Sequence, residues 1–394
     1  MEEIAEGQRW GASPADGGAP AIIALSHLRW GFVYQRPQHL LSRAAGTRRV
    51  FFVEEPVYDG GAIRLAERAI APGVLACVPH LPAGMTRRDE ELHVASMLRA
   101  LIARHGLSRY VLWYETPMFA PHTEGLDPIA SVYDCMDELA AFAQAPEDVS
   151  DREAELLSRV DLVFTGGHSL FERKRHLHRG VHAFPSSVDA AHFAAARRPI
   201  EEPADQASIA RPRLGYFGVV DERIDLGLLE HIADARPDWQ LVVVGPVVKI
   251  DPDRLPERPN IHYVGLRSYE ELPAYVGGWD VAMMPFARND ATRCISPTKT
   301  LEYLAAGRPV VSTWVHDVVH PYGDQGLVGI AESPEAFVKA AEAALAADHA
   351  ARLAAVDAVL ANTSWDRTWS AMDRLLDEVI RARIGTRSPA AVLT

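Results

Sequence analysis

A short polar segment, Ser296–Glu302, holds the residue types that most plainly suggest chemistry in this chain. Ser296 and Pro297 suit the start of a helix, because a hydroxyl can cap the helix and the proline ring fixes φ. Free N–H groups at such a start bind anions, and Lys299 in the first turn opposes the helix dipole unless an anion shares the site. Glu302 lies on the same helix face, where its carboxylate can grip hydroxyls. The spacing predicts either a nucleotide-sugar pocket or an ordinary helix–strand unit with a surface Lys–Glu pair.

The run from Thr298 to Val311 continues with a helix stop at Gly307 and an apolar strand. It resembles the donor-binding segment of GT-B glycosyltransferases of the glycosyltransferase-4-like group, and its lysine is closer to the teichuronic-acid and glucuronosyltransferase-like branches. In that family the segment carries a Glu-x7-Glu pattern. Glu302 matches the second glutamate, and Cys294 stands in place of the first. The resemblance therefore implies a sugar transferase that lacks one hydroxyl contact, and it leaves retaining and inverting chemistry open.

The composition favours two globular domains and argues against nucleic acid as a partner. The chain has 394 residues, of which 48% are hydrophobic, and this is enough for two apolar cores. Its formal charge of −13 opposes binding to a phosphate backbone, which demands a basic surface. Cys77, Cys135 and Cys294 are scattered along the chain, so we expect no disulfide framework, and a reducing cytoplasm fits.

The first twenty residues and one basic cluster bear on where the protein works. Residues 1–20 lack the basic and apolar regions of a signal peptide, so we expect a disordered tail. No apolar run approaches the length that spans a membrane. The basic cluster, residues 173–179, forms either a solvated helix face or a patch that docks on a membrane near a lipid-linked acceptor. We expect a cytoplasmic protein, with peripheral membrane association as the alternative.

Short apolar runs alternate with helical patterns along the chain, which predicts an α/β fold with parallel sheets. In the first half, strands are expected at 21–27, 50–56, 74–80, 110–115, 130–135, 162–166 and 181–185, with helices at 38–45, 90–105, 151–159 and 169–176. In the second half, strands are expected at 213–219, 240–245, 261–264, 281–285 and 309–313. The resemblance implies the GT-B fold, in which two Rossmann-like parallel-sheet domains face a cleft.

Composition shifts divide the chain into five parts. Residues 1–20 form the tail, and residues 21–196 form an acceptor-side domain. Residues 197–212, which are rich in proline and acidic side chains, are expected to link it to a donor domain, residues 213–363. A last helix begins near residue 364, and the resemblance implies that residues 364–394 cross back to the first domain.

Strand ends in the second half supply the candidate donor-binding residues. Glycine lets a phosphate approach the backbone, and an arginine nearby supplies charge, although a tight turn with an exposed arginine explains the same residues equally. By the resemblance, one loop holds the nucleobase and another wraps the sugar or its phosphates. The candidates are Gly218, Arg223, Gly265, Leu266, Arg267, Phe286, Ser296, Pro297, Thr298, Lys299, Thr300 and Glu302.

Polar and aromatic residues at strand ends of the first half suggest the opposite wall of a binding cleft. The acceptor-side candidates are His27, Arg29, Trp30, Gln35 and Arg36. Removing the proton from an attacking hydroxyl calls for a base. The candidates, in order of preference, are the strand-end carboxylates Asp137, Asp134 and Glu115, with His27 and His168 as alternatives. The competing interpretation is a capped strand–helix turn in which Asp137 is a helix N-cap.

Other classes fit less well. No G-x-G-x-x-G pattern follows a predicted strand, which disfavours a dinucleotide oxidoreductase. The triplet Asp251–Asp253 lies in a proline-rich loop and indicates a turn, so we expect no metal, and no cofactor beyond the donor substrate. The resulting hypothesis is a hexosyltransferase that moves a sugar from a UDP-, GDP- or dTDP-sugar to a hydroxyl of a glycan, a lipid-linked sugar or a small molecule. The alternatives are a nucleotide-sugar epimerase or phosphorylase on this scaffold, and a partner subunit that binds the donor without turnover.

Overall fold

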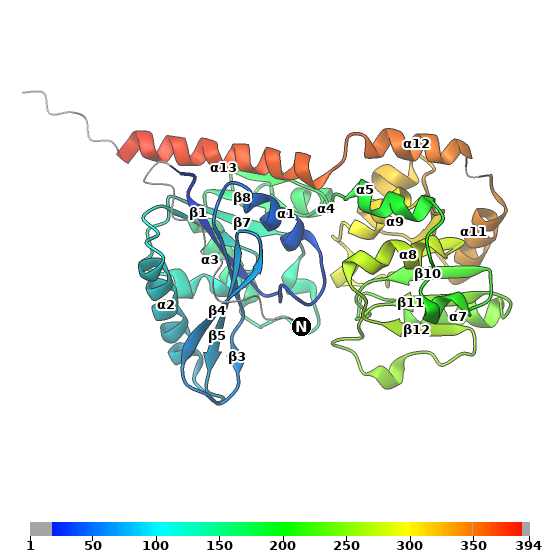
Figure 1. Ribbon diagram of the computed structural model, residues 1–394, viewed down its shortest axis with the longest axis horizontal. Coiled ribbons are helices and arrows are strands. Elements are labelled where there is room, and N and C mark those ends of the chain that lie inside the picture. The colour runs from blue at the N-terminus through cyan, green and yellow to red at the C-terminus, as the bar shows by residue number, and fades with distance from the viewer. Residues whose placement is uncertain (1–17, 349, 388–394) are drawn as a thin grey trace, which may run out of the picture.

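The computed structural model describes residues 18–348 and 350–387, which form two α/β domains side by side (Figure 1). Each domain is built on a parallel sheet, as the sequence predicted. In the first strand, Ile23 and Leu25 enter one apolar core while Ile22 and Ala24 enter another. Because successive side chains point to opposite faces of a strand, this sheet is covered on both sides. The expected tail falls outside the described residues except for 18–20.

The sheet of the first domain has nine strands in the part of the chain that is described. Their order is β3-β5-β2-β1-β6-β7-β8-β9, with β4 antiparallel to β5 and the other pairings parallel. The strands are β1 (Ala21–Ser26), β2 (Val50–Glu54), β3 (Val57–Tyr58), β4 (Arg64–Ala71), β5 (Val74–Leu81), β6 (Tyr110–Tyr114), β7 (Ala130–Cys135), β8 (Leu162–Thr165) and β9 (Val181–Ala183).

The sheet of the second domain has six described strands, all parallel, in the order β12-β11-β10-β13-β14-β15. They are β10 (Arg213–Phe217), β11 (Gln240–Val244), β12 (Ile261–Gly265), β13 (Val281–Met284), β14 (Val310–Thr313) and β15 (Val328–Ala331). β10 lies at the centre, between β11 and β13. Its carboxyl end, and those of its neighbours, present the loops expected to hold a donor.

Helices pack around both sheets. They are α1 (Arg36–Ala44), α2 (Arg87–Arg104), α3 (Val149–Arg159), α4 (His168–Lys174), α5 (Ala190–Ala194), α6 (Ala204–Ala207), α7 (Leu226–Ala235), α8 (Leu272–Gly277), α9 (Thr298–Ala305), α10 (His316–Val318), α11 (Pro334–Ala346), α12 (Ala350–Leu360) and α13 (Trp365–Arg387). None of those in the described part of the chain combines the length and the apolar composition that a membrane crossing requires.

The chain crosses between the domains twice. The first crossing is residues 184–189, because Phe193 and Ala196 already lie in the core of the second domain. It precedes the segment 197–212 that was expected to be the linker. That segment packs on the second domain, where the buried Gln206 side chain donates to the Tyr275 carbonyl oxygen. The proline and acidic residues of 197–212 therefore belong to the surface of the second domain and do not mark the connection between the domains.

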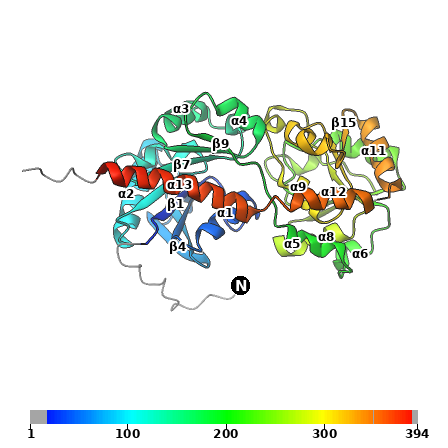
Figure 2. The same cartoon turned by 90° about the horizontal axis from the view of Figure 1, so that it is seen from above.

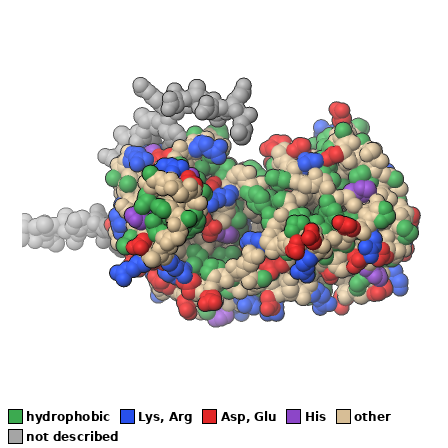
Figure 3. All heavy atoms as spheres, turned by 90° about the horizontal axis from the view of Figure 1, so that it is seen from below, with side chains coloured by type: hydrophobic (Ala, Val, Ile, Leu, Met, Phe, Trp, Pro, Cys, Tyr) green, Lys and Arg blue, Asp and Glu red, His purple; other side chains and the backbone are tan. Residues whose placement is uncertain are grey.

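The return crossing lies between α12 and α13. Figure 2 shows α12 lying over the second domain and α13 over the first. One face of α13 is buried in the core of the first domain through Trp365, Trp369, Met372, Leu376 and Ile380. On the face opposite α13 the surface is hollowed between the two domains (Figure 3).

Candidate active site

The backbone at the carboxyl end of β10 forms the floor of the candidate donor site. Gly218 has φ +136°, and a Cβ atom there would lie 2.2 Å from Lys299 Cε. Gly245, at the end of β11, has φ +145°, and its Cβ would lie 2.0 Å from the Gly218 carbonyl oxygen. Both positions therefore require glycine. The close packing lays the Lys299 side chain directly over the Gly218 backbone.

Lys299 and Glu302 project from the first turns of α9. The Lys299 ammonium lies 5.7 Å from the centroid of the Tyr216 ring and forms no ion pair within 4 Å in the described part of the chain. Glu302 is 4% exposed, and its Oε2 has no hydrogen-bond partner among the described residues. Burial raises the pKa of Glu302 to about 7, against the charge of Lys299 and a hydrogen bond from Thr298. Burial also lowers the pKa of Lys299, which Glu302 opposes. These two groups retain free hydrogen-bonding capacity that a ligand can use.

Ser296 does not cap α9, contrary to the sequence-based expectation. The cap position is Pro297, and no side chain caps this helix. The Ser296 hydroxyl instead accepts from the Ser186 N–H (3.4 Å), and its carbonyl accepts from the Ser186 hydroxyl (2.5 Å). Ser296 therefore ties the start of the candidate donor segment to the first crossing, and the N–H groups of α9 keep no competing side-chain acceptor.

Arg223 reaches the cleft but is already neutralised. Its guanidinium donates to both carboxylate oxygens of Asp221, at 2.7–3.1 Å, and lies 5.6 Å from the ring centroid of Phe142 in the first domain. Asp221 accordingly raises the pKa of Arg223 against the effect of burial. The same Phe142 ring has the Lys249 ammonium 5.9 Å from its centroid. Two cations of the second domain thus meet one aromatic ring of the first.

Several expected donor contacts have structural roles. Phe286 is 4% exposed in the core of the second domain, and Thr300 is buried with its hydroxyl 3.5 Å from the Met284 sulfur. Both are corrections: Phe286 turns into the core after β13, and Thr300 lies on the buried face of α9. The Arg267 guanidinium is bound by Asp205 (2.6 Å) and by the Tyr275 hydroxyl (2.7 Å).

The last residue of β12 and the loop after it, residues 265–267, are the candidate contact for the nucleobase, and they have an open face. Gly265 has φ +81°, and a Cβ atom there would meet nothing within 4 Å. Leu266 follows it and is 47% exposed. An unobstructed glycine beside an exposed apolar side chain is compatible with the backbone contacts to a base that the sequence predicted.

The preferred base, Asp137, faces the donor side of the cleft. Its carboxylate makes no hydrogen bond or ion pair to a described residue and caps no helix, since the short helix at 139–141 begins after Glu138 without a side-chain cap. Burial raises the pKa of Asp137, while Arg223 and Lys299 oppose this shift. A carboxylate of the first domain is therefore held close to two cations of the second.

Asp134 is a poor second choice for a base. It is fully buried and forms a forked ion pair with Arg36, with distances of 2.7–3.1 Å. Arg36 also donates to the Phe184 carbonyl oxygen at 2.8 Å, beside the first crossing. The pair neutralises both side chains, so neither Asp134 nor Arg36 has the free group that sequence reasoning assigned to it.

Glu115 and His27 lie together at the ends of β6 and β1. Glu115 is 1% exposed with neither carboxylate oxygen partnered within the described residues. Burial raises its pKa to about 8, and the nearby Ser26 hydroxyl opposes this shift only in part. Burial also lowers the pKa of His27 to about 4, and the charge of Lys249 adds to this. At neutral pH the site therefore holds a protonated carboxyl beside a neutral imidazole.

The remaining acceptor-side candidates shape the wall of the cleft. Arg29 pairs with Glu54 (3.0 Å) and also donates to the Glu55 carbonyl oxygen. The Trp30 ring packs edge-on against Phe52. Gln35 forms a capping box at the start of α1. These side chains stabilise the loop between β1 and α1, and their polar groups are used within the protein.

The sequence-based prediction missed two contacts that close the cleft. Tyr34 of the first domain stacks on Tyr269 of the second, with ring centroids 4.5 Å apart. Lys249 has φ 59° and is the non-glycine residue with positive φ in the described chain. The sequence did contain a hint of the role of Lys249. A glycine follows each of the neighbouring strands β10 and β11, and a cation comes a few residues after each glycine: Arg223 after Gly218, and Lys249 after Gly245.

Two further expectations concern charge. Within the described residues, no group of three or more His, Cys, Asp or Glu side chains is arranged to hold a metal ion. In the basic cluster, Arg173 and Lys174 pair with Glu138, and Arg175 pairs with Glu172. Acidic neighbours therefore offset three of its cations.

Comparison with known proteins agrees with this geometry. Residues 211–347 match the family described as Glycosyl transferases group 1. Across 92% of the chain, the fold is similar to a sucrose-phosphate synthase from Thermosynechococcus elongatus, with 15% identity, a TM-score of 0.71 and all of that chain covered. An alpha,alpha-trehalose-phosphate synthase (UDP-forming) from Burkholderia vietnamiensis gives 15% identity and a TM-score of 0.63, with 92% of this chain and 97% of that chain covered. The two parallel-sheet domains have the GT-B fold of these structures, and residues 211–347 of the second domain match a glycosyltransferase family.

A relative with a narrower description also matches. The chain is similar to TuaH of Bacillus subtilis (strain 168), named as a teichuronic acid biosynthesis glycosyltransferase, with 26% identity over 225 residues. The alignment covers 52% of this chain and 55% of that protein, so the match spans about half the length of the curated relative. The resemblance seen in the sequence to a teichuronic-acid-type branch is thereby confirmed.

Proposed function

We propose that the protein moves a sugar from a UDP-, GDP- or dTDP-linked donor to an acceptor hydroxyl without a metal ion. The observation that carries this proposal is that α9 places the unpaired Lys299 ammonium over the Gly218 backbone and, one turn on, the buried Glu302 carboxylate with an unpartnered oxygen among the described residues. A diphosphate needs cationic and N–H donors, whereas sugar or ribose hydroxyls need a carboxylate acceptor. The family match at residues 211–347 covers all three residues.

Each side chain has a distinct task in this proposal. Lys299 and the N–H groups of α9 hold the diphosphate and supply the positive charge that a metal ion would otherwise give. The acceptor oxygen attacks the anomeric carbon, and the bond from that carbon to the nucleotide phosphate oxygen breaks. If the reaction inverts, Asp137 takes the acceptor proton. If it retains, Asp137 only orients the acceptor.

The acceptor is proposed to be a glycan, a lipid-linked sugar or a small molecule. The name of the related TuaH favours a growing polysaccharide, since that protein is described by its part in teichuronic acid biosynthesis. Work in the cytoplasm, with peripheral contact to a membrane that carries the acceptor, stays a prediction. Arg179 and His176 are the members of the basic cluster left to support it, since Arg173, Lys174 and Arg175 have acidic partners and His178 contacts the Val160 carbonyl oxygen.

A second candidate is a partner subunit that binds the donor without turnover. Cys294 favours it, because this residue stands in place of a glutamate and is 6% exposed against the core of the first domain. Burial raises the pKa of its thiol, so it cannot replace a carboxylate as a hydroxyl acceptor.

Nucleotide release separates the candidates. We would incubate the protein with UDP-, GDP- and dTDP-hexoses, with and without a panel of acceptor glycans. Release of free nucleotide only with an acceptor supports the transferase. Interconversion of sugars without an acceptor would indicate the epimerase alternative, and release driven by inorganic phosphate would indicate the phosphorylase. Binding without any release would indicate the partner subunit.

A further inference from the structure

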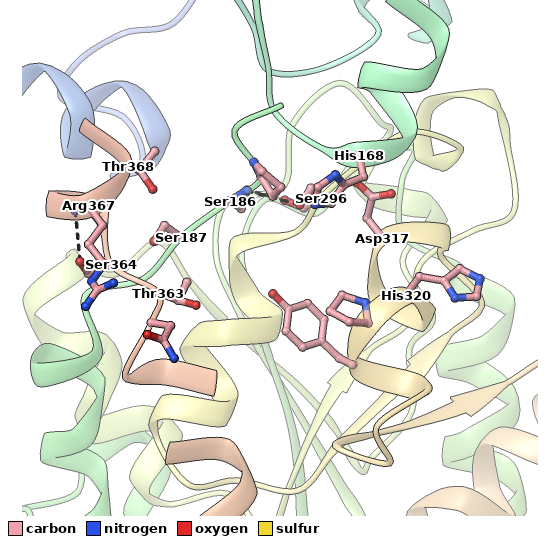
Figure 4. A pocket seen from close by; sticks show the side chains of 14 residues that line it. His168, Ser186, Ser187, Ser296, Asp317, His320, Thr363, Ser364, Arg367 and Thr368 are labelled. Carbon is pink, nitrogen blue, oxygen red and sulfur yellow. Dashed lines mark hydrogen bonds between the residues drawn. The ribbon is translucent and has the colours of Figure 1, made fainter. Parts of the chain in front are cut away.

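A cavity lies where the chain crosses between the domains (Figure 4). Its volume is about 250 Å³. The first crossing lines it through Ser186 and Ser187, and the return crossing lines it through Thr363 and Ser364. Any molecule that fills this cavity therefore touches both segments that connect the domains.

The two ends of the cavity differ in charge. Figure 4 shows Arg367 and Thr368 on one side and His168 and Asp317 on the other. Arg367 lies in the first turn of α13, and its guanidinium has no hydrogen bond or ion pair to a described residue. A cation in this position opposes the helix dipole, and Asp366, the acidic residue of the same turn, is already paired with Arg43 at 2.8 Å. The Asp317 carboxylate, at the other end, accepts from the Ser169 N–H at 3.0 Å.

Between these ends the walls carry hydroxyl groups. Ser187 is 1% exposed, and its hydroxyl has no partner among the described residues. A buried hydroxyl that lacks a partner is costly. The Tyr322 side chain also lines the cavity. This wall matches a ligand that carries several hydroxyls of its own.

We propose that this hinge cavity binds a small phosphorylated sugar, with its phosphate at the Arg367 end and its hydroxyls toward Ser187 and Asp317. The ligand would bridge both crossings and would touch Ser296, which begins the candidate donor segment. Binding there favours one arrangement of the domains and is coupled to nucleotide binding in the cleft, because the two equilibria share that arrangement. This role goes beyond the proposed transfer reaction and does not depend on it.

Calorimetric titration of the full chain tests the proposal, with glucose 6-phosphate, glucose and inorganic phosphate as the probes. We expect saturable binding of glucose 6-phosphate that is at least about tenfold tighter than either of the other probes. Arg367→Ala, at an exposed position, should weaken it by about tenfold or more, and Ser187→Ala by a smaller factor. Arg374→Ala removes an exposed arginine from the same helix and should change nothing.

Three results would overturn this assignment. They are the absence of saturable binding, equal binding by wild type and Arg367→Ala, and binding that Lys299→Ala abolishes while Arg367→Ala retains it. The last would place the probe in the transfer cleft. Titration of the same samples with UDP, GDP and dTDP reports on the proposed function separately, so the failure of one proposal does not imply the failure of the other.

Discussion

Replacing Lys299 with methionine removes one positive charge from the first turn of α9 and keeps the apolar stem over Tyr216. The ammonium lies over the Gly218 backbone and has no ion pair in the described chain, so its hydrogen bonds are available to a ligand. A charge-assisted hydrogen bond contributes about 1.5–3 kcal/mol. Its loss should raise the Kd for the bound nucleotide by about 10- to 150-fold. Isothermal titration calorimetry measures this directly.

The same substitution acts on Glu302. The charge of Lys299 lowers the pKa of Glu302, which burial raises to about 7. Without that charge the pKa rises further, so the ionised carboxylate appears only at higher pH. A hydroxyl contact that needs the ionised form should therefore gain strength at more alkaline pH in Lys299→Met than in wild type. Titrations between about pH 6 and pH 9 would detect the displacement.

Lys339→Met is the matched control, because Lys339 lies on the exposed face of α11. This control should bind nucleotide as wild type does. If Lys299→Met is folded by circular dichroism and its Kd is within twofold of wild type, the assignment of the diphosphate site to α9 is wrong.

Three further predictions test other parts of the account. Asp137→Asn should lower kcat by about 10²–10⁴ with an unchanged nucleotide Kd, and near-normal turnover at saturating acceptor would remove Asp137 from its role. Glu115→Gln should stabilise the fold most at high pH. The folded-state pKa of Glu115 is raised from 4.5 to about 8, so between these pH values the free energy of unfolding of the wild type falls, relative to the variant, by up to about 1.4 kcal/mol per pH unit. Above this range the difference between the two proteins is constant. A difference that does not change with pH in urea unfolding would contradict the buried, unpartnered carboxyl. Transfer activity should survive EDTA, and a strict need for Mg²⁺ or Mn²⁺ would contradict charge supply by Lys299 and the N–H groups of α9.

The sheet cores were predictable because buried parallel strands are continuous apolar runs. β11 and β13 follow that rule, and their expected ranges agree with the structure to within a residue. β4 was missed because its sequence, RLAERAIA, places Arg and Glu on an edge strand that is largely exposed. β15 is four residues long and includes Gly329, which gives little pattern to read. The first crossing was misplaced because burial of Phe193 depends on tertiary packing.

The candidate site was predictable where chemistry depends on local sequence. Lys299 and Glu302 share one helix face, so their proximity followed from spacing. The partner of Asp134 did not, because Arg36 lies 98 positions away and reaches it through the fold. Whether a strand-end side chain faces solvent or core also depends on the loop, and this hid the burial of Phe286.

The central claim is that nucleotide sugar binds through Lys299 and Glu302 and loses its sugar to an acceptor. The most direct measurement follows acceptor-dependent release of free nucleotide from each nucleotide hexose, for wild type, Lys299→Met and Glu302→Gln in parallel. The account predicts release by wild type with at least one donor, little without acceptor, and a large loss of donor affinity or turnover in both variants while they remain folded. Wild-type rates in both variants, or release that is indifferent to acceptor, would contradict it.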